Sequence, residues 1–233
     1  MGRIGLSLLD LLYPPHCYLC EKPLREHRYI CENCLEKMNR IESPYCGRCG
    51  RPVFRAGGLC SRCAEGEREF FLARSVGLYL SEEPLAQSIT GLKYEGERAL
   101  ARDLAGLFLS GSTEELLDYV QAITFVPQSE RRGKERPFNH ARSLALNLSR
   151  LTSLPFFRGL RKVDQTEPQA SLGREERLHN LEGSFAPTQG WGYDNVLLID
   201  DVFTTGATAD ECAKTLREGG CERVCVATLA RRL

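Results

Sequence analysis

Two aspartates follow a continuous apolar run in this 233-residue chain. The run is V-L-L-I at positions 196–199, and it is followed by Asp200, Asp201 and then T-T-G-A-T at 204–208. A continuous apolar segment is expected for a strand covered on both faces of a parallel sheet. Because ligands bind beyond the carboxyl ends of such strands, we expect a functional site here.

The residue types after this strand suit a sugar phosphate. Adjacent carboxylates accept hydrogen bonds from the 2- and 3-hydroxyls of a ribose, and one of them can reach a magnesium ion through water. The T-T-G-A-T segment opens a helix, whose free N–H groups and dipole favour an anion, while glycine permits close backbone approach. We therefore predict a 5-phosphoribosyl site formed by Asp200, Asp201, Thr204, Thr205, Gly206, Ala207 and Thr208.

The alternative is an ordinary strand-to-helix loop in which Asp and Thr serve as helix caps. One capping residue would suffice for that role, whereas two acids and three threonines surround the glycine here. Other phosphate motifs are absent from the sequence: it has no G-x4-G-K-[ST], and no G-x-G-x-x-G opens a helix after a strand.

Cysteines are the second group of residues that could do chemistry, and eight of the eleven fall within the first 63 residues. Two C-x2-C pairs separated by ten residues form a unit that recurs 29 residues later. One pair places two thiolates around an ion, and a second pair completes a tetrahedral site that suits zinc. The predicted ligands are Cys17, Cys20, Cys31, Cys34, Cys46, Cys49, Cys60 and Cys63.

Disulfides or redox-active C-x2-C motifs are the alternatives to zinc. The first fifteen residues are too short for a membrane span and lack a small-residue cleavage site, so we expect an amphipathic helix and a cytoplasmic protein with reduced thiols. Consecutive pairing, with the first four cysteines on one ion and the last four on another, is favoured over a crossed arrangement. Four thiolates close each site, so we expect two structural zinc ions.

The chain changes character at about residue 75, where short apolar runs begin to alternate with amphipathic ones. We predict strands at 75–80, 120–127, 195–200 and 223–230, and helices at 84–94, 99–109, 139–151 and 207–220. The last helix places Ala209, Cys212, Ala213 and Leu216 on one side. Strand, helix and strand in succession predict a parallel α/β sheet flanked by helices over residues 71–233, preceded by a zinc-ribbon-like region over 1–70.

The segment V-L-L-I-D-D-V-F-T-T-G-A-T resembles the 5-phosphoribosyl 1-diphosphate signature of type I phosphoribosyltransferases. Together with the paired cysteine units, it is similar to the ComF family of competence-associated proteins, which includes ComFC and GntX-like members. The likeness extends to F-V-P at 125–127, R-R-G-K-E-R-P-F-N at 131–139, and Thr166, Gln169, Arg177 and Asn180. It implies a zinc ribbon on a phosphoribosyltransferase-like domain, and a role in DNA uptake during natural transformation.

The chain departs from the family in its basic loop. The family's R-G-F-N-Q appears here as R-P-F-N-H at 136–140, and Ser129 stands where a histidine is usual. Pro137 stiffens a position where glycine would be free, and His140 replaces an amide with an ionisable ring.

Phosphoribosyl transfer breaks the bond from ribose C1 to pyrophosphate, so magnesium and cations must neutralise the leaving group. Residues 128–177 contain eleven Lys or Arg against six Asp or Glu, in a chain with 31 of each sign. A solvated polar loop is the alternative for any single residue of this stretch. The candidate pyrophosphate contacts are Lys93, Arg131, Arg132, Lys134 and Arg136.

Two hypotheses follow. The first is a phosphoribosyltransferase of the glycosyltransferase class, or a relic of one, that binds 5-phosphoribosyl 1-diphosphate and magnesium; no acceptor is evident. His140 and His179 are possible bases, but each fits a loop or helix surface better. The second is an adaptor that binds single-stranded DNA alongside other competence proteins. It rests on basic residues around the zinc units: Arg25, Arg28, Lys37, Arg40, Arg48, Arg51 and Arg55.

Overall fold

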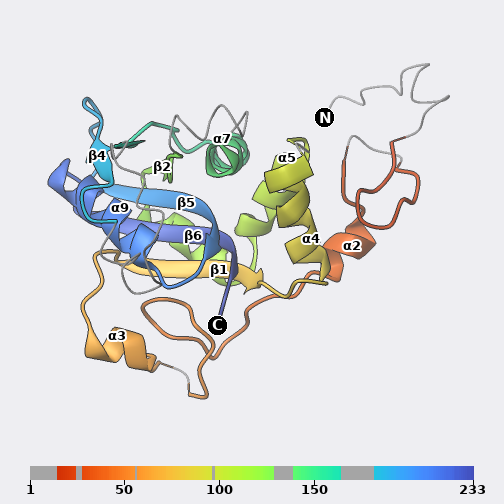
Figure 1. Ribbon diagram of the computed structural model, residues 1–233, viewed down its shortest axis with the longest axis horizontal. Coiled ribbons are helices and arrows are strands. Elements are labelled where there is room, and N and C mark those ends of the chain that lie inside the picture. The colour runs from red at the N-terminus through yellow and green to blue at the C-terminus, as the bar shows by residue number, and fades with distance from the viewer. Residues whose placement is uncertain (1–14, 25–27, 56, 96–97, 129–138, 164–180) are drawn as a thin grey trace, which may run out of the picture.

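Four parallel strands form the centre of the molecule (Figure 1). The structure is a computed structural model that describes residues 15–24, 28–55, 57–95, 98–128, 139–163 and 181–233. The strand order is β1-β6-β5-β2. The strands are β1 (Leu72–Leu78), β2 (Ala122–Phe125), β5 (Asn195–Phe203) and β6 (Arg223–Arg231). The predicted fold class, a parallel α/β sheet behind a cysteine-rich region, is confirmed.

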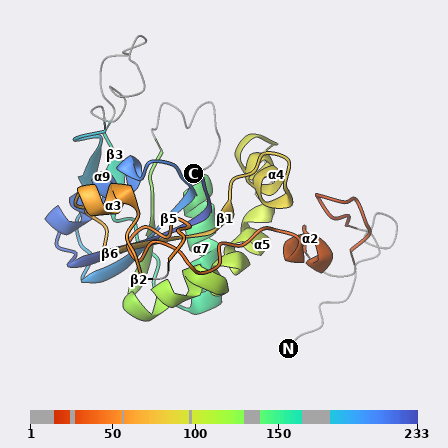
Figure 2. The ribbon, with the colours of Figure 1, turned by 90° about the horizontal axis from the view of Figure 1, so that it is seen from below.

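The central strands are buried on both faces, which explains their continuous apolar runs. Along β5, Leu197 and Ile199 belong to one hydrophobic cluster, whereas Val196 and Leu198 belong to another. Successive side chains of a strand point to opposite faces, so the two clusters are the two sides of the sheet. Figure 2 shows α9 and α3 on one side of the strands, and α5 and α7 on the other.

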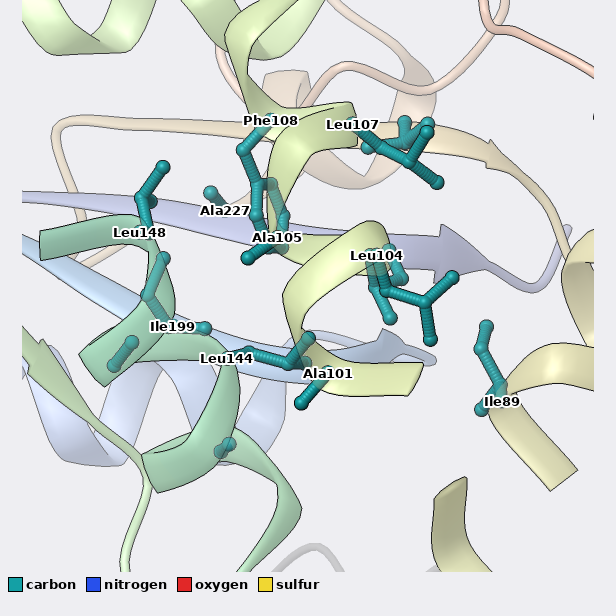
Figure 3. Packing of buried hydrophobic residues seen from close by; sticks show 14 of the residues in the cluster. Ile89, Ala101, Leu104, Ala105, Leu107, Phe108, Leu144, Leu148, Ile199 and Ala227 are labelled. Atoms are coloured by element: carbon teal, nitrogen blue, oxygen red, sulfur yellow. The ribbon is translucent and has the colours of Figure 1, made fainter. Parts of the chain in front are cut away.

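The first side is covered by helices, which pack on the sheet (Figure 3). Leu104 and Phe108 come from consecutive helical segments and Leu144 from another helix, and all three belong to the same buried cluster as Ile199 of β5. The segments on this side are α4 (Pro84–Thr90), the π-helix η1 (Gly91–Glu95), α5 (Leu100–Gly106), the 3-10 helices η2 (Leu107–Leu109) and η3 (Gly111–Tyr119), and α7 (His140–Thr152).

The second side is covered by α9 (Ala207–Glu218). Its predicted apolar stripe is confirmed: Ala209, Cys212, Ala213 and Leu216 are all buried. A short antiparallel pair, β3 (Leu160–Lys162) and β4 (Phe185–Pro187), accompanies this helix.

Several predicted boundaries were wrong. Strand β1 begins and ends earlier than the predicted 75–80, and the predicted helix 84–94 divides into α4 and the π-helix. Strand β5 does not end at Asp200 but continues to Phe203, because β6 runs beside it as far as Arg231 and supplies backbone partners. The helix η3 and the pair β3–β4 were not predicted. The N-terminal amphipathic helix lies outside the described residues.

The two cysteine units lie at different places around the sheet (Figure 1). The first contains α2 (Glu32–Glu36) and lies next to α4, whereas the second contains α3 (Ser61–Glu65) and lies on the far side of β1. Within the described residues, no helix has the length and apolar character needed to cross a bilayer. The predicted domain boundary after residue 70 stays a prediction.

Candidate functional site

The eight predicted cysteine ligands form two clusters of four, Cys17/Cys20/Cys31/Cys34 and Cys46/Cys49/Cys60/Cys63. Within each cluster the sulfur atoms lie within 4.8 Å of one another. The Sγ atoms of Cys20 and Cys31 are 3.7 Å apart, as are those of Cys49 and Cys60. A zinc ion with bonds of about 2.3 Å to four sulfurs requires sulfurs about 3.8 Å apart. The clusters are therefore consistent with two zinc ions, paired consecutively as favoured above.

The clusters repeat each other in detail. In each, a backbone N–H of the third cysteine donates to the Sγ of the first, at 3.3 Å. Burial raises the pKa of Cys17 and Cys46, but surrounding backbone N–H groups outweigh it, so the pKa falls to about 7 and about 6. The pKa of Cys34 and Cys63 is raised by burial and by the neighbouring thiols. A cation bound among the four sulfurs would favour their thiolate forms, and four sulfurs at these distances can hold one.

The predicted acid pair lies near the carboxyl end of β5, with its side chains on opposite faces of the strand. Asp201 forms an ion pair with Lys93 of the π-helix η1, with Nζ 2.7 Å from Oδ1. Asp200 lies near Cys212 of α9 and contributes to raising its pKa, after burial. π-helical turns occur frequently at functional sites. This one brings the predicted cation Lys93 to the acid pair.

Asp200 is an unusual carboxylate. Burial, followed by repulsion from Asp201, raises its pKa from an ordinary 3.8 to about 7. The Asp201 N–H donates to its Oδ1 at 2.9 Å, and Lys93 and Lys162 lower the pKa without restoring it. A carboxylate held near neutrality by burial accommodates a hydroxyl donor or a cation, because either compensates its charge.

The segment Thr204–Thr208 forms a turn between β5 and α9. Gly206 lies at the N-cap of α9 with φ +91°, a conformation that favours glycine. The Ala207 N–H reaches only the Thr205 Oγ1, at 3.3 Å. Within the described part of the chain, the N–H groups of Thr205, Gly206 and Thr208 have no acceptor. The turn thus offers free amides at the N-terminus of a twelve-residue helix, the arrangement that binds phosphate groups.

Sequence reasoning missed Arg68, which lies beside this turn. Its Nη1 is 2.5 Å from Oδ2 of Asp210, in the first turn of α9. Arg68, Thr205 and Ala207 line one cavity of about 600 Å³, which Asp200 and Asp201 do not line. Arg68 and Asp210 are 142 residues apart, so no spacing motif connects them.

The structure brings together only part of the predicted site. Asp200, Asp201, Lys93 and the 204–208 turn lie around the carboxyl end of β5. Outside the described residues lie Arg131, Arg132, Lys134, Arg136, Pro137, Thr166, Gln169, Arg177, His179 and Asn180. The expectation of a surface position for His140 was wrong: it begins α7 and is only 1% exposed. The polar context of the preceding loop concealed that this residue is the first of the helix to face the core.

Comparison with known proteins identifies the family. Residues 8–64 match the double zinc ribbon domain. The chain is 31% identical over 210 residues to competence protein F of Haemophilus influenzae, covering 87% of this chain and 90% of that protein. The chain belongs to the ComF family of competence proteins. DNA utilization protein YhgH of Escherichia coli strain K12 is 30% identical over 232 residues, covering 96% of this chain and 100% of that protein. Competence protein ComFC of Bacillus subtilis strain 168 is 27% identical, covering 88% and 72%.

Two solved structures are similar to part of this chain. The allosteric regulatory enzyme of purine biosynthesis matches with a TM-score of 0.41 at 20% identity, over 60% of this chain and 30% of that one. Glutamine phosphoribosylpyrophosphate amidotransferase from B. subtilis, complexed with ADP and GMP, matches with a TM-score of 0.39 at 17% identity, over the same shares. The chain thus spans less than a third of either enzyme chain.

Proposed function

We propose that this ComF-family protein binds 5-phosphoribosyl 1-diphosphate together with magnesium, and transfers the phosphoribosyl group to an unidentified acceptor. The observation that carries the proposal is the turn at 204–208. Its amides at Thr205, Gly206 and Thr208 have no acceptor in the described part of the chain, and only Val202 and Phe203 separate it from the two carboxylates.

Each side of the site has a distinct task in this proposal. The amides and hydroxyls of residues 204–208 hold the 5-phosphate, with the positive end of the α9 dipole behind them. Asp200 and Asp201 accept hydrogen bonds from the ribose hydroxyls. When bound, magnesium would neutralise charge on the departing pyrophosphate. The basic residues Arg131, Arg132, Lys134 and Arg136 would add further positive charge to that side.

Lys93 would have two roles, one without ligand and one with ligand bound. Without ligand its ammonium neutralises Asp201 at 2.7 Å. When the ribose hydroxyls occupy the carboxylates, Lys93 is released toward the diphosphate, where a cation stabilises the leaving group. Both side chains are largely buried, with 20% of Lys93 and 14% of Asp201 exposed, so the exchange takes place where electrostatic interactions are strong.

Zinc is the ion we assign to both cysteine clusters. Thiolate ligands, the tetrahedral spacing of the sulfurs and the match to the double zinc ribbon domain all support it. We place the protein in the cytoplasm, where cysteines stay reduced, and infer a role in DNA uptake; its relatives are named competence protein F and DNA utilization protein YhgH.

Calorimetry with 5-phosphoribosyl 1-diphosphate and magnesium tests the proposal. We expect saturable binding by the zinc-loaded protein, and its loss in the double variant Asp200→Asn, Asp201→Asn. A matched control is Asp118→Asn, Asp194→Asn, which removes the same charge from two exposed positions and should bind as the wild type does. Absence of heat with the wild type, or equal binding by both double variants, would refute the proposal.

One observation favours the second candidate, a single-stranded-DNA adaptor. Phe54 is fully exposed in the second ribbon, between Arg51 and Arg55, whereas Tyr45 of the same ribbon is covered by the Arg74 guanidinium at 4.9 Å. An exposed ring between cations suits base stacking, worth about 1–3 kcal/mol per base. Binding of oligothymidine should weaken steeply with salt and about tenfold in Phe54→Ala. A flat salt dependence would exclude this candidate.

A further inference from the structure

The linker between the second cysteine cluster and β1 holds the start of α9. Arg68 donates from Nη1 to Oδ2 of Asp210 at 2.5 Å, and the Glu69 N–H donates to Oδ1 of the same carboxylate at 3.1 Å. Asp210 lies in the first turn of α9, and its own N–H donates to the Gly206 carbonyl at 2.8 Å. One carboxylate therefore joins the linker to the turn that we propose holds the 5-phosphate.

Arg68 also packs directly against that turn. A methyl group built on Gly206 would lie 3.3 Å from the Arg68 Nη1 and 2.8 Å from the Phe203 ring. The Arg68 Nε is buried, and the guanidinium interacts with the side chain of Cys63 in the second cluster as well as with Asp210. Without Arg68, the negative charge of Asp210 would offset part of the positive end of the α9 dipole and would repel a phosphate bound there.

The position of Arg68 is fixed in turn by the second ribbon. Arg48 lies between Cys46 and Cys49, and it donates from Nη2 to the Arg68 carbonyl at 2.7 Å and from Nε to the Phe70 carbonyl at 3.0 Å. These two bonds clamp the linker on both sides of Glu69. Arg48 can hold this position only while the turn between the two cysteines keeps its shape.

A second connection runs from the same cysteine turn to the same loop. Arg231 at the end of β6 donates from Nη1 to the Cys49 carbonyl at 2.6 Å, and its guanidinium lies 5.0 Å over the Phe203 ring. That ring borders Gly206. Two paths of direct contacts thus lead from the second cysteine cluster to residues 203–210.

We propose that Arg68 is a positioning residue through which the second cluster, when it holds its ion, sets the geometry of the 204–208 turn. This inference rests on the proposed function only for the identity of the ligand. A loaded cluster fixes Arg48, Arg48 fixes the linker, and Arg68 then neutralises Asp210 and supports Gly206. The turn is preorganised, so a phosphate bears less of the ordering cost when it binds.

The test compares Arg68→Gln with Arg62→Gln in the full-length protein. Arg62 lines the same cavity, so its variant removes the same charge from the same region without touching the Asp210 pair. Hydrogen–deuterium exchange without ligand should increase in peptides covering 203–212 for Arg68→Gln alone, with the zinc content unchanged. Arg68→Lys, which keeps a cation for Asp210, should restore most of the protection.

The same proteins are then titrated with 5-phosphoribosyl 1-diphosphate and magnesium. Arg68→Gln should weaken binding about tenfold, as expected for the loss of a charge-assisted contact, and Arg62→Gln much less. Loss of the ion from the second cluster, through Cys60→Ser with Cys63→Ser, should raise exchange at 203–212, whereas Cys31→Ser with Cys34→Ser should not.

The exchange experiment decides the inference even if no ligand binds. Unchanged exchange at 203–212 in Arg68→Gln, or equal changes in the two arginine variants, would overturn it. So would equal effects of the two cysteine variants. A wild type that shows the expected exchange pattern but no binding would refute the proposed ligand and leave the coupling standing.

Discussion

The two zinc ribbons share their cysteine spacing and local structure but differ in the helix that each one contacts. Five residues after its last cysteine, each ribbon places a side chain on the start of a helix: Asn39 in the first and Arg68 in the second. Asn39 donates to Oε2 of Glu83, the N-cap residue of α4, at 2.6 Å. Arg68 pairs with Asp210 in the first turn of α9.

These contacts lead to the two sides of one site. Helix α4 continues into the π-helix that carries Lys93, the partner of Asp201. Helix α9 begins at the turn proposed to hold the 5-phosphate. The two copies of the ribbon thus support two different helices of the same domain. Because the cysteine frameworks are equivalent, the residue five positions after the last cysteine, Asn39 or Arg68, determines which helix each ribbon contacts.

Loss of either metal should have the largest effect, and the two losses should differ. The carbonyls of Gly47 and Cys49 in the second ribbon accept from Arg74 and Arg231, which are 5% and 3% exposed. Unfolding this ribbon removes the carbonyl acceptor of the buried Arg231 and one acceptor of Arg74, which keeps its pairing with Glu115. Each lost hydrogen bond to a charged group costs about 1.5–3 kcal/mol. Cys46→Ser with Cys49→Ser should therefore lower the melting temperature more than Cys17→Ser with Cys20→Ser.

Thermal unfolding with a zinc assay checks this prediction. Each double variant should retain one zinc per chain, and the remaining sheet should unfold at a higher temperature when only the first ribbon is lost. Equal melting temperatures would show that the ribbons are energetically interchangeable.

Apolar residues at equivalent positions of the two ribbons differ in how deeply they are buried. Ile30 of the first ribbon is fully buried in the cluster that includes α4 and α5, whereas its counterpart Leu59 in the second is 55% exposed. Ile30→Ala should cost about 2–5 kcal/mol in the free energy of unfolding. Leu59→Ala should cost within about 0.5 kcal/mol. Urea denaturation measures both, and similar costs would contradict the assigned packing.

Asp200 and Asp201 should make a smaller contribution to the free energy of unfolding, one that depends on pH. The folded-state pKa of Asp200 is raised from 3.8 to about 7, so the folded protein binds this proton more tightly than the unfolded chain. Its contribution to stability is present below about pH 4 and is lost as the pH rises through about 7. Asp200→Asn removes this loss, a gain of about 2–4 kcal/mol over the wild type at pH 8, since each pKa unit corresponds to about 1.4 kcal/mol.

Urea unfolding of the wild type and of Asp200→Asn at pH 5 and pH 8 checks this prediction. Effects of pH on the ribbons are the same in both proteins and cancel in the difference between their free energies of unfolding. The exposed Asp194 provides the control. Asp194→Asn should shift the stability equally at both pH values, and the same flat behaviour in Asp200→Asn would contradict the raised pKa.

The sequence predicted what depends on local spacing. The C-x2-C units, the apolar run of β5 and the stripe of α9 each repeat within a few residues, so the zinc clusters, the strand and the buried helix face were predictable. The length of β5 was not, because its last residues owe their strand conformation to the partner β6. Nor was the pairing of Lys93 with Asp201, which depends on a π-helical turn.

Arg68 shows most clearly which contacts the sequence could not predict. In sequence it is one of 31 basic residues and lies among glutamates after the last ribbon cysteine, which favours a solvated linker. Its role arises only when the fold brings the linker to α9, 142 residues later. His140 was misjudged for a related reason, since the burial of a helix's first residue depends on what packs against it.

A crystal structure of the zinc-loaded protein with 5-phosphoribosyl 1-diphosphate and magnesium tests the central claim most directly. We expect the 5-phosphate on the amides of Thr205, Gly206 and Thr208, the ribose hydroxyls on Asp200 and Asp201, and Arg68 still paired with Asp210. A ligand bound elsewhere, or ribose hydroxyls out of reach of both aspartates, would contradict it.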